Sequence, residues 1–202
     1  MSDRSDARAH LQPVDPAKAH RLLNHGPTVL VSARHEGVTN VMAAAWACVL
    51  DLNPTKVTIV LDKIARTREL AEASGRFVLQ VPVVEQLVMV DSLGTTTLHD
   101  DPQKLAKSAV KLFEIPGSAG PFVSGCAAWL SCRIIPEPRN QATYDLFIAE
   151  VDSAWADDRI FSNGHWLFQS APSGWRTIHH VSGGHYLAIG ETINTNRDLI
   201  HG

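Results

Sequence analysis

Three polar residues close to the end of a β-branched run could bind an anion. Lys63, Arg66 and Thr67 follow the run at residues 57–61, and residues 68–74 favour a helix. A helix that begins here presents its first backbone N–H groups beside two cations and a hydroxyl, an arrangement that suits a phosphate. The sequence therefore predicts a phosphate site between this strand and this helix.

A second segment, at residues 40–47, carries Asn40, four alanines and one tryptophan. Small side chains leave the backbone of such a segment open to a flat ligand, and the Asn40 amide can hydrogen bond a polyol or a ring edge. The residues expected to lie against the flat part are Met42, Ala43, Ala44, Ala45 and Trp46. Together the two segments predict a planar, phosphorylated ligand.

The order of these motifs resembles the flavin reductase-like, FMN-binding split-barrel proteins, which include the flavoredoxins. The matching residues are Thr39, Asn40, Val41, Ala43, Ala44, Trp46, Arg66 and Thr67. Further matches at residues 77–82, 121–134, 146–151 and 183–186 extend the resemblance over most of residues 25–190. It implies a mainly β fold with peripheral helices, a split β-barrel, and a homodimer that holds FMN at the subunit interface.

The resemblance adds two candidate residues. A lysine that opens the helix after residue 102 reaches the flavin in such proteins, which points to Lys104. Relatives often place a histidine over the flavin where this chain has Tyr144, so its phenol could contact the ring or lie half in water. The predicted cofactor-binding set is Asn40, Met42, Ala43, Ala44, Ala45, Trp46, Lys63, Arg66, Thr67, Lys104 and Tyr144.

The chemistry implied by this resemblance is redox chemistry at a bound flavin. Hydride transfer belongs to the cofactor, and no Ser-His-Asp or Cys-His set is evident, so we predict no catalytic side chain. The leading hypothesis is an FMN-dependent oxidoreductase that passes electrons from NAD(P)H to flavin. The alternatives are a flavoredoxin-like electron carrier without NAD(P)H activity and a binding protein for another planar ligand such as haem or a deazaflavin.

The composition of the chain excludes several other classes of protein. The chain of 202 residues suits one domain, and a net charge of −3 argues against a dedicated nucleic-acid binder. No apolar run reaches the roughly 18 residues of a membrane span, and residues 1–6 lack the apolar core of a signal peptide, so we expect a cytoplasmic protein without a membrane contact. Cys48, Cys126 and Cys132 have neither metal nor disulfide spacing, and we expect reduced thiols.

The pattern also predicts the elements that position the site. A flexible arm (residues 1–16), a split-barrel domain (17–190) and a polar tail (191–202) are expected. The predicted strands are residues 28–32, 57–61, 77–81, 127–135 and 144–155, and the predicted helices are 16–24, 68–74, 85–93 and 103–113. His179, His180 and His185 invite a metal interpretation, but their spacing favours an aromatic cover over the ligand or the subunit interface.

Overall fold

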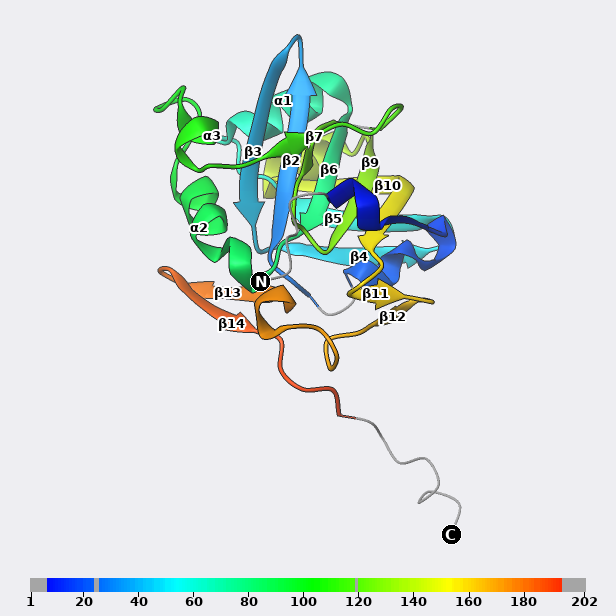
Figure 1. Cartoon of the computed structure of the whole chain (residues 1–202). Helices are drawn as coiled ribbons and strands as arrows, with labels where there is room; N and C mark the ends of the chain where they lie inside the picture. The colour runs from blue at the N-terminus through cyan, green and yellow to red at the C-terminus, as the bar shows by residue number, and fades with distance from the viewer. Residues whose placement is uncertain (1–6, 24–25, 119, 194–202) are drawn as a thin grey trace.

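An eight-stranded antiparallel sheet forms the body of the molecule, as the computed structural model in Figure 1 shows. The structure describes residues 7–23, 26–118 and 120–193. Seven strands follow the order β3-β2-β6-β9-β10-β5-β4, and β1 pairs with β10. Their bounds are β1 (Leu11–Val14), β2 (Val29–His35), β3 (Val38–Ala44), β4 (Ala47–Leu52), β5 (Thr55–Val60), β6 (Arg76–Val81), β9 (Ala128–Ile135) and β10 (Leu146–Asp157).

The sheet is rolled into a split barrel. Its two end strands, β3 and β4, are consecutive in the chain, with only Ala45 and Trp46 between them. Burial alternates along β5, as expected for a strand with one buried face, whereas β2 is buried through its first five residues. The strand between β2 and β9 is β6, which is buried over residues 77–81, the polar Gln80 included.

Helices and short strands surround the barrel. The longer helices are α1 (Arg66–Ser74) and α2 (Leu87–Thr95), and the short ones are α3 (Lys104–Lys107), α4 (Pro138–Tyr144), η1 (Ala7–His10), η2 (Pro16–Leu22), η3 (Val84–Gln86) and η4 (Ser173–Trp175). The remaining strands form three hairpins: β7 (Leu112–Phe113) with β8 (Phe122–Val123), β11 (Phe161–Ser162) with β12 (His165–Trp166), and β13 (Ile178–Ser182) with β14 (His185–Ala188). No described helix is long and apolar enough to span a membrane.

Two apolar clusters hold these layers together. The larger contains Phe77 and Phe147, and the smaller lies around Trp129 and Phe122, all almost fully buried. The Trp129 indole N–H donates to the carbonyl of Val123 at 2.9 Å, so this large side chain is buried without an unpaired donor. The clusters fix the strands and helices that carry the site.

The predicted strands and the helices at residues 68–74 and 85–93 are present, with shifted ends. Gly75 ends α1 in the left-handed conformation, with φ of 69°, as a C-terminal glycine should. The helix predicted at residues 103–113 is wrong in length, because α3 ends at Lys107 and Ala109 takes a φ of 56°, after which the chain enters β7. The apolar residues of this segment pack against the smaller apolar cluster mostly from a loop, so their helix-like spacing did not indicate a long helix.

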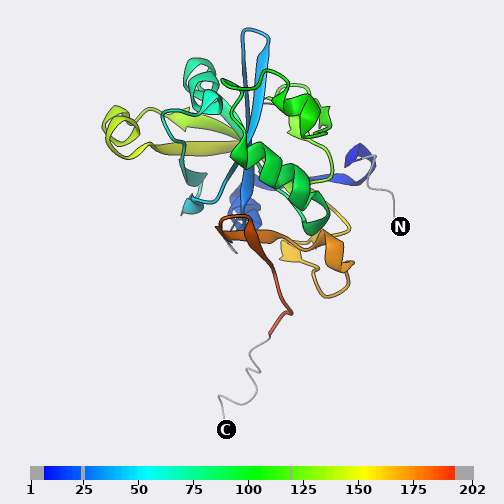
Figure 2. The ribbon, with the colours of Figure 1, turned by 90° about the vertical axis from the view of Figure 1, so that its left-hand side faces the viewer.

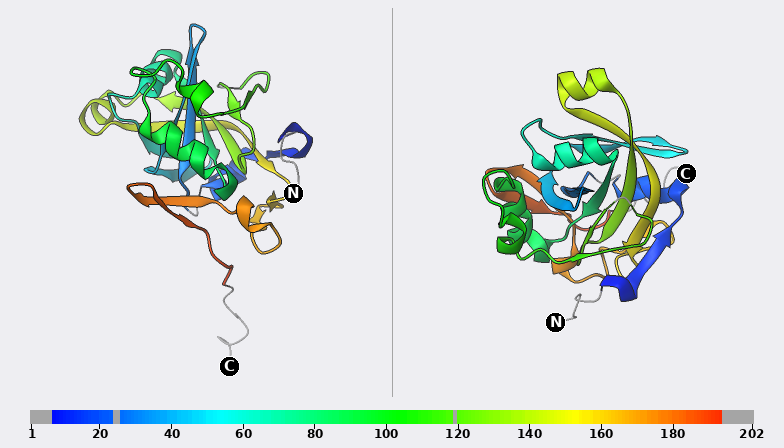
Figure 3. Two further views of the ribbon diagram at one scale, coloured as in Figure 1. Left: turned by 60° about the vertical axis from the view of Figure 1, so that its left-hand side comes forward. Right: turned by 90° about the horizontal axis from the view of Figure 1, so that it is seen from above.

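The segment around residue 144 also differs from the prediction. Tyr144 ends α4 instead of opening a strand, and Asp145 adopts a left-handed conformation, with φ of 54°, before β10 begins. Strands β9 and β10 with α4 between them form an arm that extends from the body (Figures 2 and 3). A proline in the first turn of α4 marks the beginning of this helix. The segments on both sides have strand-like sequences, so this short helix was not predicted.

The predicted arm at residues 1–16 is corrected in part. Residues 11–14 form β1, whose register places Leu11 opposite Asp157 and Val14 opposite Ala154 of β10. Asp15 then caps the first turn of η2, since its carboxylate accepts the Ala17 N–H at 3.1 Å. Residues 1–6, and residues 194–202 of the predicted tail, lie outside the described part of the chain.

Candidate functional site

A groove of about 690 Å³ runs beside β3, between the beginning of α1 and the loop that joins α2 to α3. Since β3 ends the strand order, its outer backbone N–H and C=O groups have no partner among the described strands. In Figure 1, β3 forms the left-hand edge of the sheet, with α2 and α3 beside it. The lining residues are Asn40, Met42, Asp62, Ile64, Ala65, Arg66, Thr67, Leu93, Gly94, Thr95, Thr96, Thr97, His99, Asp100 and Lys104.

Asn40 connects β3 to α1 at the base of the groove. It is 2% exposed, and its side-chain N–H donates to the Thr67 hydroxyl at 3.0 Å. The Asn40 Oδ1 atom is buried and has no partner within the described structure. Because an unsatisfied buried acceptor costs free energy, a lining atom of this kind marks a place where a ligand can donate.

The beginning of α1 provides a second polar end. Its N-cap residue, Ala65, makes no side-chain hydrogen bond to the first turn, so the amide groups there remain available to an anion. Arg66 stands at this end and is paired with Glu69, whose other oxygen lies 3.0 Å from Nε2 of His99. The Arg66 hydrogen bond, together with His99, holds the pKa of Glu69 below its ordinary value, so this carboxylate stays ionised at neutral pH.

Lys104 contributes an ammonium group to the wall opposite β3. The residue is only 3% exposed, and burial lowers the pKa of its amine to about 8. No described carboxylate forms an ion pair with it, although Asp62 and Asp100 also line the groove. A buried ammonium with no paired anion favours a negatively charged or electron-rich ligand.

A second cavity of about 350 Å³ continues from the groove along β3. It shares Gly94 and Thr95 with the groove, and Ala43, Ala44 and Ala45 form its floor. Helix α2 can approach β3 closely because residue 94 is glycine: a Cβ there would lie 3.3 Å from that of Ala43. The polar groove and the alanine floor are therefore neighbours along one strand.

Residues 21–176 match the family model described as the flavin reductase like domain. The chain belongs to this family. A 35% identical relative, named uncharacterized protein YddH of Escherichia coli K12, aligns over 184 residues, which are 90% of this chain and 96% of that protein. The matched region includes the groove and excludes the β13–β14 hairpin.

Two solved structures illustrate the fold of the family. An FMN-binding domain of a flavin reductases-like enzyme from Shewanella baltica OS155 is 56% identical, covers 92% of this chain and 97% of its own, and has a TM-score of 0.91. Flavoredoxin of Desulfovibrio vulgaris (Miyazaki F) shares the fold at a TM-score of 0.72 and 19% identity, over 85% of this chain and 91% of its own.

The structure brings most of the predicted site residues together, but not all of them. Asn40, Met42, Arg66, Thr67 and Lys104 line the groove, while the three alanines line the adjoining cavity. The segment predicted to bind a phosphate and the alanine segment therefore meet at one edge of the barrel.

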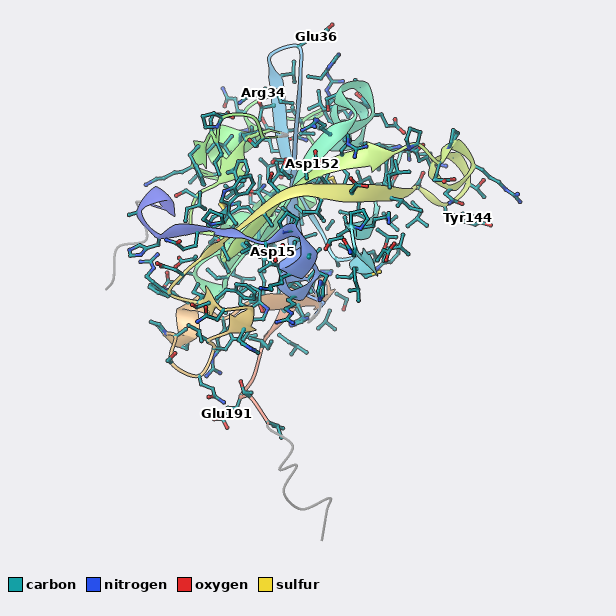
Figure 4. All side chains as sticks on the ribbon, turned by 90° about the vertical axis from the view of Figure 1, so that its right-hand side faces the viewer. Asp15, Arg34, Glu36, Tyr144, Asp152 and Glu191 are labelled. Carbon is teal, nitrogen blue, oxygen red and sulfur yellow. The ribbon has the colours of Figure 1, made fainter. Side chains whose placement is uncertain are left out.

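Three predicted residues lie outside both cavities. Trp46 is 74% exposed at the junction of β3 and β4, and Lys63 is exposed in the turn before α1. Figure 4 shows Tyr144 at the outer end of the β9–β10 arm, where it is 63% exposed. Among the described residues of one chain these side chains line neither cavity, so their roles stay predictions.

Sequence reasoning missed the loop after α2, which supplies Thr96, Thr97, His99 and Asp100 to the groove. The three consecutive threonines after Gly94 were the available signal, since hydroxyl-rich loops often bind polar ligands. No three His, Cys, Asp or Glu side chains gather as a metal site in the described ranges, and the ring of His180 instead packs on Tyr186 at 5.0 Å.

Proposed function

We propose that this protein binds FMN in the groove beside β3 and works as an oxidoreductase that passes electrons from NAD(P)H to flavin. The observation that carries the proposal is that Asn40 and the beginning of α1 line one groove. Asn40 hydrogen bonds Thr67, which lies 27 residues later in the sequence. A ligand with a polar chain and a phosphate at one end matches this pair of groups.

The residues present fit such a cofactor. The open first turn of α1, with Arg66 and Thr67, would hold the phosphate, and the unpartnered Oδ1 of Asn40 would accept from the ribityl chain or the ring edge. The free backbone edge of β3 would hydrogen bond the ring, over the small side chains that follow Met42. The 56% identical Shewanella baltica protein, described as FMN-binding, supports the same assignment.

When bound, FMN would supply the redox chemistry, which is hydride and electron transfer. The chain's residues bind and orient the cofactor, and the loop at residues 96–100 covers one side of the groove. Lys104 places a positive charge on the groove wall, where it favours an electron-rich ligand. This division of roles explains why no catalytic acid or nucleophile is predicted.

We further propose that two chains form a homodimer through the β4 side of the barrel. Exposed apolar side chains lie on β4 (Leu50 at 51% and Leu52 at 56%), just before it (Trp46 at 74%) and in the turn before α1 (Ile64 at 75%). Large apolar side chains are enriched in the centres of subunit interfaces. A Leu50→Asp, Leu52→Asp double variant is expected to sediment as a monomer, and an unchanged mass would remove this surface from the interface.

The first experiment tests cofactor binding and electron transfer in sequence. The purified protein is expected to carry FMN or to gain thermal stability when FMN is added, because ligands that bind only the folded state stabilise it. Rapid mixing of the FMN-loaded protein with NADH or NADPH should then bleach the flavin absorbance. A protein that neither carries nor responds to FMN defeats the proposal, and FMN binding without bleaching would favour the electron-carrier alternative.

A further inference from the structure

Lys104 is the one residue lining the groove that is both charged and buried, and no described residue forms an ion pair with it. Its side chain comes from α3, which lies beside β3 in Figure 1. Burial lowers the pKa of its amine to about 8, so at pH 7 most molecules still carry the positive charge. A buried cation without a counter-ion is costly, and a ligand that brings a negative charge removes this cost.

The other cation of the groove already has a carboxylate partner. Arg66 is paired with Glu69, whose other oxygen lies 3.0 Å from Nε2 of His99. The proposed function assigns the phosphate to Arg66 and to the first turn of α1, where the helix provides free N–H groups. Lys104 belongs to a different element, and its charge is therefore available to the rest of the cofactor.

The charge of a flavin ring depends on its redox state. A hydride carries two electrons and one proton, so its addition turns the neutral oxidised ring into a reduced ring with one negative charge. NAD(P)H supplies this hydride in the proposed function. A buried ammonium attracts such an anion much more strongly than a neutral ring, because the surrounding dielectric is low.

The carboxylates of the groove oppose this attraction only weakly. Asp62 and Asp100 line the groove, but both residues are exposed, so water and salt screen their charges. Glu69 is held by Arg66 and His99. The net preference of the groove for a charged ring therefore follows the sign of Lys104.

We propose that Lys104 makes this protein bind reduced FMN more tightly than oxidised FMN, so that the flavin stays bound while electrons leave for an acceptor. This inference rests on the proposed function, because it takes FMN as the ligand of the groove. It assigns to Lys104 the choice between the two redox states of one cofactor. The acceptor is then a molecule that takes electrons from a bound flavin and does not require released reduced flavin.

The midpoint potential of bound FMN tests the proposal without any measurement of turnover. It is determined at pH 7 by anaerobic reductive titration against a reference dye, after the binding of oxidised FMN has been measured by fluorescence. Reduced FMN should bind at least about tenfold more tightly than oxidised FMN, which places the potential of bound FMN about 30 mV or more above that of free FMN. Lys104→Met should abolish this preference.

Two controls separate the ring from the phosphate and from the general charge of the protein. Lys107→Met removes an exposed α3 lysine that is paired with Asp101 at 2.7 Å, and it should leave the potential unchanged. Riboflavin lacks the phosphate, so its bound potential should respond to Lys104→Met as strongly as that of FMN. A response of FMN alone would assign Lys104 to the phosphate and overturn the proposal.

Two further results would also overturn it. The first is a potential of bound FMN at or below that of free FMN in the unchanged protein. The second is an equal loss of affinity for oxidised and reduced FMN in Lys104→Met, which would give Lys104 a role that ignores the redox state. A protein that does not bind oxidised FMN at all defeats the proposed function instead, so the two failures are distinguishable.

Discussion

Replacement of Arg66 by alanine should weaken FMN binding and spare riboflavin, which lacks the phosphate. A hydrogen bond to a charged group contributes roughly 1.5–3 kcal/mol, which corresponds to a rise of about 10- to 150-fold in Kd. Arg66 is already paired with Glu69 within the chain. A phosphate must therefore compete with that carboxylate, and we expect a value near the lower end, about tenfold.

The matched variant is Glu69→Gln. It removes the internal competitor and a negative charge beside the phosphate, so FMN should bind more tightly while riboflavin again changes little. The pKa of Glu69 is lowered, so the carboxylate is ionised and its effect should be the same from pH 6 to pH 8. Fluorescence titration of the FMN-free protein with each flavin gives both constants under identical conditions.

Two outcomes would refute this reasoning. Equal losses for FMN and riboflavin in Arg66→Ala would mean that Arg66 supports the fold of the groove and does not contact the phosphate. Weaker FMN binding in Glu69→Gln would mean that Glu69 holds Arg66 in its binding position and does not compete with the ligand. Thermal unfolding of each variant separates both results from a general loss of stability.

Other changes test the scaffold around the groove. Lys104→Met should raise the free energy of unfolding at pH 7, because it removes a buried charge. The unchanged protein should gain stability between pH about 8 and 10.5, where the unfolded chain binds a proton that the folded protein has released, and the variant should lose this gain. Urea unfolding across that pH range checks both results. Arg68→Met leaves Asp145 without its buried partner and should lower the free energy of unfolding in urea by about 3 kcal/mol. The control Arg133→Gln breaks an exposed pair and should lower it by less than about 1 kcal/mol. Gly75→Ala should cost about 1 kcal/mol by calorimetry, since alanine disfavours the left-handed backbone.

Much of the site was accessible from the sequence because its chemistry is local. The helix that begins at Arg66 is followed by Gly75, a stop signal that the sequence displays, and Asn40 stands out as a polar residue beside a row of alanines. The family match then places both segments in one domain. Their meeting at the edge of β3 required the fold, because no residue spacing links Asn40 to Thr67.

The wrong predictions of secondary structure have a different origin. Residues 11–14 were predicted as a loose arm because four residues do not indicate which strand they pair with. Their partner, β10, lies more than a hundred residues later in the chain. The helix predicted at residues 103–113 fails because Ala109 takes a left-handed backbone that its residue type does not signal. Contacts between distant segments decided each case, and a single sequence does not display them.

The open edge of β3 has a further consequence for the folded state. An unpaired strand edge is a template on which strands of other chains can add, and so it invites aggregation. In this protein the same backbone groups face a groove flanked by α2 and by the loop after it, which restrict the approach of another strand. If FMN occupies this groove, as proposed, storage of the protein with saturating FMN should therefore preserve its solubility.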